Sequence, residues 1–116
     1  MNKAQTLKTK KEFEFVYKNS SKYRGEICDI CILKNALSNV FYKRFKKHII
    51  KNPIFGLSIS KKIGIAVKRN YIKRQLRHIC RELLKNKNII LIIIAKNGIT
   101  EANFIDIKNH IFNAIK

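Results

Sequence analysis

The stretch SISKKIGIAVKRNYIKRQLRHICRELLK, from Ser58 to Lys85, predicts the end of a strand, a turn and a long helix. Apolar residues recur along it at i, i+4, i+7, i+8 and i+11, the spacing of one helix face: Ile72, Leu76, Ile79, Cys80 and Leu83. Polar residues recur on the opposite side at the same helical period: Asn70, Arg74, Arg77 and Arg81. We therefore expect a helix over about Ala66 to Leu84 with one face in the core and an arginine row facing outward.

The arginine row favours a bound polyanion over an ordinary solvated surface. Four of the six arginines in the chain lie between Arg69 and Arg81. Solvated helix faces usually mix charges, because like charges at i,i+4 cost a few tenths of a kcal/mol each. Glu82 is the only acid in the stretch, and it lies off the arginine row. We interpret the row as a face for phosphate groups.

The whole chain has the composition of one basic globular domain, over residues 1–116. It carries 26 Lys and Arg against 7 Asp and Glu, a formal net charge of +19, and 46% of its residues are hydrophobic. Such a charge favours nucleic acid or an anionic membrane as partner. The longest apolar run, Ile89 to Ala95, is too short to span a bilayer, which needs about 20 helical residues. Because no apolar segment follows the basic N-terminus, the expected location is the cytoplasm, with no membrane partner.

The remaining patterns predict an α+β domain. Residues 1–8 are polar and expected to be flexible, and Thr9 with Glu12 has the spacing of a capping box that opens a short helix from about Lys10 to Lys18. Apolar, β-branched runs predict strands at Glu26–Leu33, Ile54–Ser60 and Ile89–Ala95. The order strand, helix, strand across residues 54–95 indicates a parallel pair joined by a crossover.

Two further segments are less regular. Thr100 and Asn103 open a last helix from about Glu101, whose expected inward face consists of Phe104, Ile107, Ile111 and Phe112. Residues 34–52 leave alternatives open. Val40 to Tyr42 could extend the sheet, and the basic segment Lys43 to Lys51 suits a hairpin arm or a short helix.

The segment FGLSISKKIGIAVKRNYIKRQLR, residues 55–77, resembles the signature of the protein subunit of bacterial ribonuclease P. The matching positions are Gly56, Leu57, Ser58, Ser60, Lys61, Lys62, Gly64, Ala66, Val67, Arg69, Asn70, Lys73, Arg74 and Arg77. Tyr71 stands where the family pattern has the second arginine of an Arg-Asn-Arg triplet. The resemblance implies a mixed β-sheet with helices packed on it, similar to the second domain of ribosomal protein S5, with a left-handed βαβ crossover.

The resemblance also implies two kinds of RNA contact. The long helix would lie on the catalytic RNA, through the residues Lys61, Lys62, Lys68, Arg69, Asn70, Lys73, Arg74, Arg77 and Arg81. The family's first helix carries an aromatic pair that lines a cleft for the single-stranded 5′ leader of precursor tRNA. This implies leader contacts at Phe13, Tyr17, Cys31, Ser58 and Ile65. Spacing alone favours the alternative that Phe13 and Tyr17 only dock the helix on the sheet.

The sequence carries no recognisable catalytic constellation of its own. Its acids are scattered, and Glu12 and Glu14 would lie about 200° apart on a helix. Cys28-x-x-Cys31 has a zinc-like spacing, but side chains at i and i+3 of a strand point to opposite faces. The resemblance implies that Mg²⁺ is held mainly by the RNA subunit, with no metal ligand, catalytic residue or organic cofactor in the protein.

Two other classes of protein are compatible with parts of this pattern. A ribosomal protein is also small, basic and α+β, but it would need no aromatic cleft for a single strand. A free-standing metal nuclease would cleave RNA by itself with Mg²⁺. The resemblance instead implies assistance to an RNA-based endoribonuclease, which removes the 5′ leader from precursor tRNA.

Overall fold

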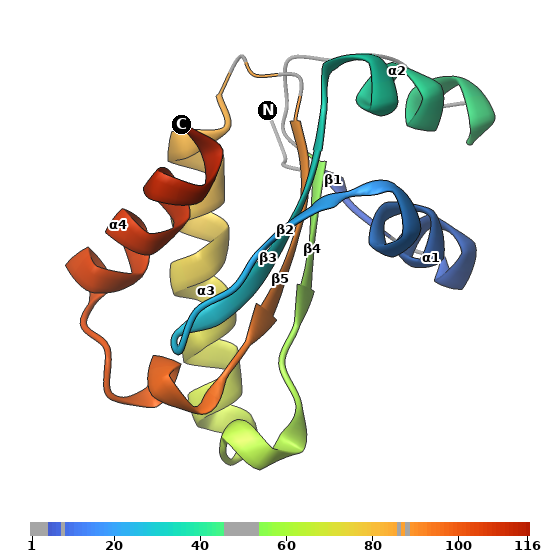
Figure 1. The fold of residues 1–116 in the computed structure, drawn as a ribbon. Coiled ribbons are helices and arrows are strands. Elements are labelled where there is room, and N and C mark those ends of the chain that lie inside the picture. The colour runs from blue at the N-terminus through green and yellow to red at the C-terminus, as the bar shows by residue number, and fades with distance from the viewer. Residues whose placement is uncertain (1–4, 8, 46–53, 86, 88) are drawn as a thin grey trace.

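The computed structural model describes residues 5–7, 9–45, 54–85, 87 and 89–116 as a mixed sheet with helices on both faces (Figure 1). In chain order its elements are β1 (Gln5–Thr6), α1 (Lys10–Asn19), β2 (Ser21–Tyr23), β3 (Cys28–Lys34), α2 (Asn35–Arg44), β4 (Ile54–Ser58), the 3-10 helix η1 (Lys61–Ile63), α3 (Ala66–Leu83), β5 (Ile89–Ala95), the 3-10 helix η2 (Asn97–Thr100) and α4 (Phe104–Ile115). The strand order is β1-β4-β5-β3-β2. The predicted α+β architecture is confirmed.

The centre of the sheet is the parallel pair β4–β5, with α3 as the connection between them. Ile54 lies opposite Ile90 and Ser58 opposite Ile94. On the other side of β5 runs β3, antiparallel to it. The predicted parallel pair is confirmed; the left-handed sense of its crossover stays a prediction from the resemblance.

Apolar residues on both faces of the sheet explain why the β5 run IILIIIA shows no alternation. Leu91 and Ile93 belong to the core shared with α3 and α4, while Ile90 and Ile92 belong to the core shared with α1. Figure 1 shows α3 and α4 together on one face and α1 and α2 on the other. A strand covered on both faces needs apolar side chains at every position.

The segment after β3 forms a helix, so the expectation that Val40 to Tyr42 extends the sheet is wrong. Phe41 is fully buried, and its ring centroid lies 5.9 Å from that of Phe15 on α1. A helix presents Phe41 and Tyr42 to the core while leaving Val40 exposed. The basic residues from Lys46 to Lys51 lie outside the described residues.

Part of the N-terminal segment adds a strand that the sequence did not predict. Gln5 and Thr6 pair with Ile54 and Phe55 as a short parallel strand. The backbone N–H of Leu7 donates to the Phe55 carbonyl at 3.1 Å, and the Leu7 side chain is buried. The flexibility of residues 1–8 stays a prediction, and residues 1–4 and 8 lie outside the described residues.

The last helix begins later than predicted. Asn103 Oδ1 accepts from the Asp106 backbone N–H at 2.8 Å, which caps α4 at Phe104. The residues from Glu101 to Asn103 connect η2 to α4. Ile107 and Ile111 are buried as expected. Phe112 is 48% exposed, so its inward placement is wrong, and Ile115 is buried in its place.

No helix within the described part of the chain is long and apolar enough to cross a membrane.

Candidate nucleic-acid interface

The two opposite faces predicted for α3 are present. Ile72, Leu76, Ile79 and Cys80 are buried against the sheet, so the other side of the helix faces outward. There Asn70, Arg74 and Arg81 are exposed, and Arg77 is half-buried. The periodicity of the sequence was sufficient to place these side chains, because the apolar face of a helix fixes the direction of its opposite face.

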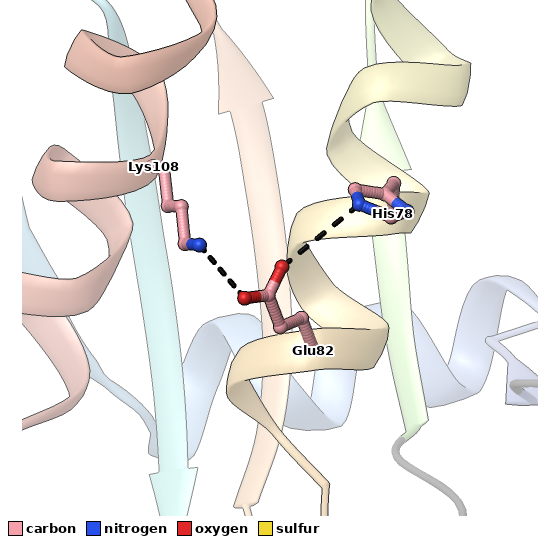
Figure 2. Close-up of polar contacts among 3 residues, drawn as sticks. All are labelled: His78, Glu82 and Lys108. Carbon is pink, nitrogen blue, oxygen red and sulfur yellow. Dashed lines mark hydrogen bonds and ion pairs between the residues drawn. The ribbon is translucent and has the colours of Figure 1, made fainter.

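The acid of α3 is engaged away from this row. Glu82 Oε1 accepts from Lys108 Nζ on α4 at 2.7 Å, and Glu82 Oε2 lies 3.9 Å from His78 Nε2, as Figure 2 shows. The hydrogen bond from Lys108, with its positive charge, lowers the pKa of the Glu82 carboxyl. Among the described residues, no carboxylate forms an ion pair with Arg74, Arg77 or Arg81. The guanidinium groups are therefore available to an external anion.

Other predicted cations surround the start of α3. Lys61 and Lys62 are exposed on η1, and Lys68 is exposed on the first turn of the helix. Arg69 has a structural role as well, because its Nε donates to the Gly64 carbonyl at 3.1 Å. This bond ties the turn before α3 to the helix and leaves the outer guanidinium nitrogens of Arg69 as donors.

The aromatic pair lies on α1, across the sheet from α3. The ring centroids of Phe13 and Tyr17 are 6.2 Å apart and tilted by 38°. Phe13 rests directly on the backbone of β4: a Cβ built at Gly56 would lie 2.7 Å from Phe13 Cε1. Tyr17 is about one-third exposed, and burial, with Cys31 nearby, raises the pKa of its hydroxyl. The rings thus dock the helix on the sheet and also border solvent, and their contact with a leader stays a prediction.

The other three predicted leader contacts differ in accessibility. Cys31 lies on the α1 face of the sheet but is only 1% exposed, so it offers no surface to an RNA strand. Ser58 is half-buried at the end of β4, in register with Ile94. Ile65 is 74% exposed immediately before α3. In Figure 1, α1 and α2 lie over one part of this face of the sheet. No helix of the described residues lies over the C-terminal ends of β4 and β5 on the same face.

A small notch joins the two sides of the sheet at the β4 edge. Its volume is about 190 Å³, and its lining residues are Leu7, Phe13, Gly56, Leu57, Lys73 and Arg77. Among the described residues, β1 pairs only with Ile54 and Phe55 of β4, and the notch lies beside the next residues of that strand, Gly56 and Leu57. Two cations of α3 and one ring of α1 meet there. No sequence pattern indicated that Leu7 would line a notch, since it lies in a polar terminal segment.

One cation near the aromatic pair was also missed. Lys22 Nζ donates to the Tyr17 carbonyl at 2.6 Å and to Ser20 Oγ at 3.1 Å. Lys22 lies opposite Cys31 in the sheet, on the same face as α1. The sequence did not predict strand β2, so nothing placed this lysine beside the rings.

The cysteines do not form a metal site. Cys28 belongs to the core under α3 and α4, and Cys31 to the core under α1, as expected for i and i+3 on a strand. All three cysteines are free and buried, and burial raises the pKa of the Cys28 thiol to about 12. Within the described ranges, no group of three His, Cys, Asp or Glu residues could hold a metal ion.

The fold and this surface define a small, strongly basic α+β protein that presents a cationic helix on one face of its sheet. The family model described as Ribonuclease P matches residues 1–116. The ribonuclease P protein component of Helicobacter hepaticus is 34% identical over 119 residues, covering 96% of this chain and 82% of that protein. That of Rickettsia canadensis is 34% identical over 116 residues, covering 95% and 93%.

Solved structures agree with these relatives. The RNase P protein of Staphylococcus aureus is similar with a TM-score of 0.72 and 25% identity, covering 96% of this chain and 92% of that one. The RNase P protein of Thermotoga maritima shares the fold, with a TM-score of 0.70 at 18% identity and coverage of 97% and 96%. The chain belongs to the ribonuclease P protein family. Membership makes it a protein component of a ribonuclease complex in tRNA processing, with an RNA partner.

Proposed function

We propose that this protein binds the catalytic RNA of ribonuclease P through α3 and receives the 5′ leader of precursor tRNA beside α1. In this role it assists endonucleolytic removal of the leader, which yields the mature tRNA 5′ end. The observation that carries the proposal is the placement of two unlike surfaces on opposite faces of one sheet. The arginine row lies on one face, the aromatic pair on the other, and the notch at the β4 edge connects them.

The α3 surface suits a folded RNA because it carries arginine side chains that form no ion pair with a carboxylate of the described residues. Arg74 and Arg81 are exposed, and the single acid of the helix is held by Lys108 on the α4 side. With the lysines of η1 and the helix, about six to eight phosphates could be contacted, which predicts a steep fall in affinity as salt rises. Phosphate contacts of this kind position a protein without reading sequence.

The α1 surface suits a single strand because it combines rings with scattered cations. Phe13 and Tyr17 can stack on unpaired bases, a contact that tolerates any base. Lys22 lies beside Tyr17, and Lys73 and Arg77 reach the notch next to Phe13. We exclude Cys31 as a contact, and retain Ser58 and Ile65 as accessible positions flanking this path.

We further propose that cleavage chemistry comes from the RNA and its Mg²⁺, in the cytoplasm, with no catalytic side chain from this protein. Three of the acidic side chains support this view, because each is paired with a lysine or buried. Glu82 pairs with Lys108, Asp29 Oδ2 lies 3.3 Å from Lys96 Nζ, and Glu12 is buried on α1. A two-metal site needs carboxylates that lie close together on an accessible surface. These three carboxylates do not form such a cluster.

Reconstitution with the RNA subunit tests the α3 part of the proposal. Arg74→Ala plus Arg81→Ala should weaken assembly strongly at moderate salt, because both guanidinium groups are exposed and neither lines the notch. Arg24→Ala is the matched control, since Arg24 is an exposed arginine before β3. If the double variant assembles as tightly as the control, the α3 face is not the RNA-binding surface.

A comparison of substrates tests the α1 part. Phe13→Leu should leave assembly intact and lower affinity for precursor tRNA more than for mature tRNA, because only the precursor carries a leader. Phe112→Leu is the control, as Phe112 is a half-exposed ring on α4. Equal affinity of the wild-type holoenzyme for precursor and mature tRNA would remove the leader role. Cleavage by the protein alone with Mg²⁺ would indicate a nuclease of a different class.

A further inference from the structure

A second hollow lies on the other flank of α3, between that helix and the segment leading into α4. Its volume is about 270 Å³. Two rings, Tyr71 and Phe104, line it, with Ile72 and Ile99 at its base. It is smaller than the roughly 300–1,000 Å³ typical of pockets for drug-sized ligands, so it suits a single planar group.

Tyr71 is the most unusual side chain of this hollow. It is 58% exposed, whereas Ile72, the next residue of the same helix, is buried in the core. The Tyr71 ring therefore leaves a large aromatic surface in contact with water. Gln75 Nε2 donates to its hydroxyl at 3.3 Å from the next turn of the helix, which restricts the ring. Tyr71 lies about 100° around the helix from Asn70, so the hollow borders the arginine row without belonging to it.

The charge around the hollow favours an anionic ligand. Lys68 is the only charged residue among the described side chains that line it. Glu82, the single acid of α3, is paired with Lys108. Glu101, between the lining residues Thr100 and Ala102, is exposed and does not line the hollow. A ligand with a flat ring and an attached phosphate would match both the aromatic walls and the lysine, and nucleotides have that composition.

We propose that this hollow accepts one unstacked nucleobase of the RNA that lies on α3. The base would stack on Tyr71, with Lys68 near its phosphate and the polar atoms of Gln75 and Asn103 at its edge. This inference rests on the proposed function, because it places the same RNA against α3. It assigns Tyr71 a stacking contact at the position where the family pattern has an arginine, so an aromatic contact replaces a charged one there.

Binding of the RNA subunit to Tyr71 variants tests the site. Tyr71→Ala should lower affinity about 5- to 150-fold, the range expected for loss of one base–aromatic stack. Tyr71→Phe should retain most of the affinity, since it keeps the ring. The slope of log K against log salt should be unchanged in both, whereas Arg74→Ala should reduce it by about one. Val67→Ala is the control, because Val67 is 73% exposed on α3 and does not line the hollow.

The outcomes separate the two proposals. If Tyr71→Ala binds like wild type while Arg74→Ala plus Arg81→Ala binds weakly, the base site is refuted and the α3 interface stands. If neither variant loses affinity, the α3 interface itself fails. Equal losses in Tyr71→Ala and Tyr71→Phe would also overturn stacking, because the hydroxyl and not the ring would then be the contact. Circular dichroism should be the same for all variants, as Tyr71 is exposed.

Discussion

The contact between Gly56 and Phe13 makes a sharp test of how α1 is seated on the sheet. In Gly56→Ala, the new methyl carbon would lie 2.7 Å from Phe13 Cε1, 2.8 Å from Phe13 Cζ and 3.2 Å from Leu7 Cδ1. Nonbonded carbon atoms prefer about 3.5–4.0 Å, so the ring must retreat by about 1 Å. The methyl group therefore moves the ring that lines the notch without removing any aromatic atom.

Two opposing contributions set the size of the effect on stability. Overpacking a closely fitted site costs about 1–3 kcal/mol. Replacing glycine in a strand returns about 0.5–1 kcal/mol, because alanine loses less backbone entropy on folding. We expect a net loss of about 1 kcal/mol in the free energy of unfolding. We also expect weaker discrimination of precursor from mature tRNA, since the ring no longer sits at the β4 edge.

Urea unfolding and holoenzyme binding measure these two effects. The double variant Gly56→Ala plus Phe13→Leu is the decisive comparison, because leucine lacks the outer ring atoms that the methyl group meets. The double variant should be more stable than the sum of the single changes by more than about 0.5 kcal/mol, the usual limit of additivity. Asn113→Ala, at an exposed position on α4 outside both proposed surfaces, is the control.

A single result would refute this reasoning. If Gly56→Ala stabilises the protein, and its effect adds to that of Phe13→Leu, the ring does not rest on the Gly56 backbone. Phe13 would then not line the notch, and α1 would contribute no ring beside Lys73 and Arg77 of α3.

Three further predictions concern the scaffold. Leu76→Ala, at the fully buried centre of the α3 face, should lower the free energy of unfolding by about 2–5 kcal/mol in urea titrations, with Gln75→Ala as the half-exposed neighbour for comparison. Glu82→Gln should lower the melting temperature slightly at pH 7, because it removes the ion pair with Lys108. Folding lowers the pKa of the Glu82 carboxyl, so the ion pair stabilises the protein above the ordinary carboxyl pKa, and this stabilisation disappears as pH falls through the folded pKa. A difference in melting temperature that persists in acid would contradict the ion pair. A thiol-labelling reagent at pH 7 should modify the cysteines only on unfolding, since all three are buried and the pKa of Cys28 is raised to about 12; rapid labelling of the native protein would contradict that burial.

Sequence periodicity alone predicted α3 and its two faces, because the direction of every side chain on a helix follows from its position along the chain. Ile72 and Leu76 had to face the core, so Arg74 and Arg81 had to face outward, as observed. The uninterrupted run of β5 likewise indicated a strand covered on both faces. The residues around Arg69 and Asn70 carried the resemblance that the family match confirms.

Tertiary structure decided the features that depend on contacts between distant segments. Phe41 and Tyr42 fit a strand pattern locally, but burial against Phe15 selects the helix α2. The burial of Cys31 beneath α1 depends on where that helix lies on the sheet, which its own residues do not specify.

The notch and the hollow beside Tyr71 have the same origin. Each is lined by segments that are distant in the chain: Leu7, α1, β4 and α3 line the notch, and α3, η2 and the start of α4 line the hollow. A local pattern fixes which face of an element is apolar, and thereby which side chains point outward. Only the packing of several elements fixes which of those side chains end up facing one another across a gap, and that is what a binding site requires.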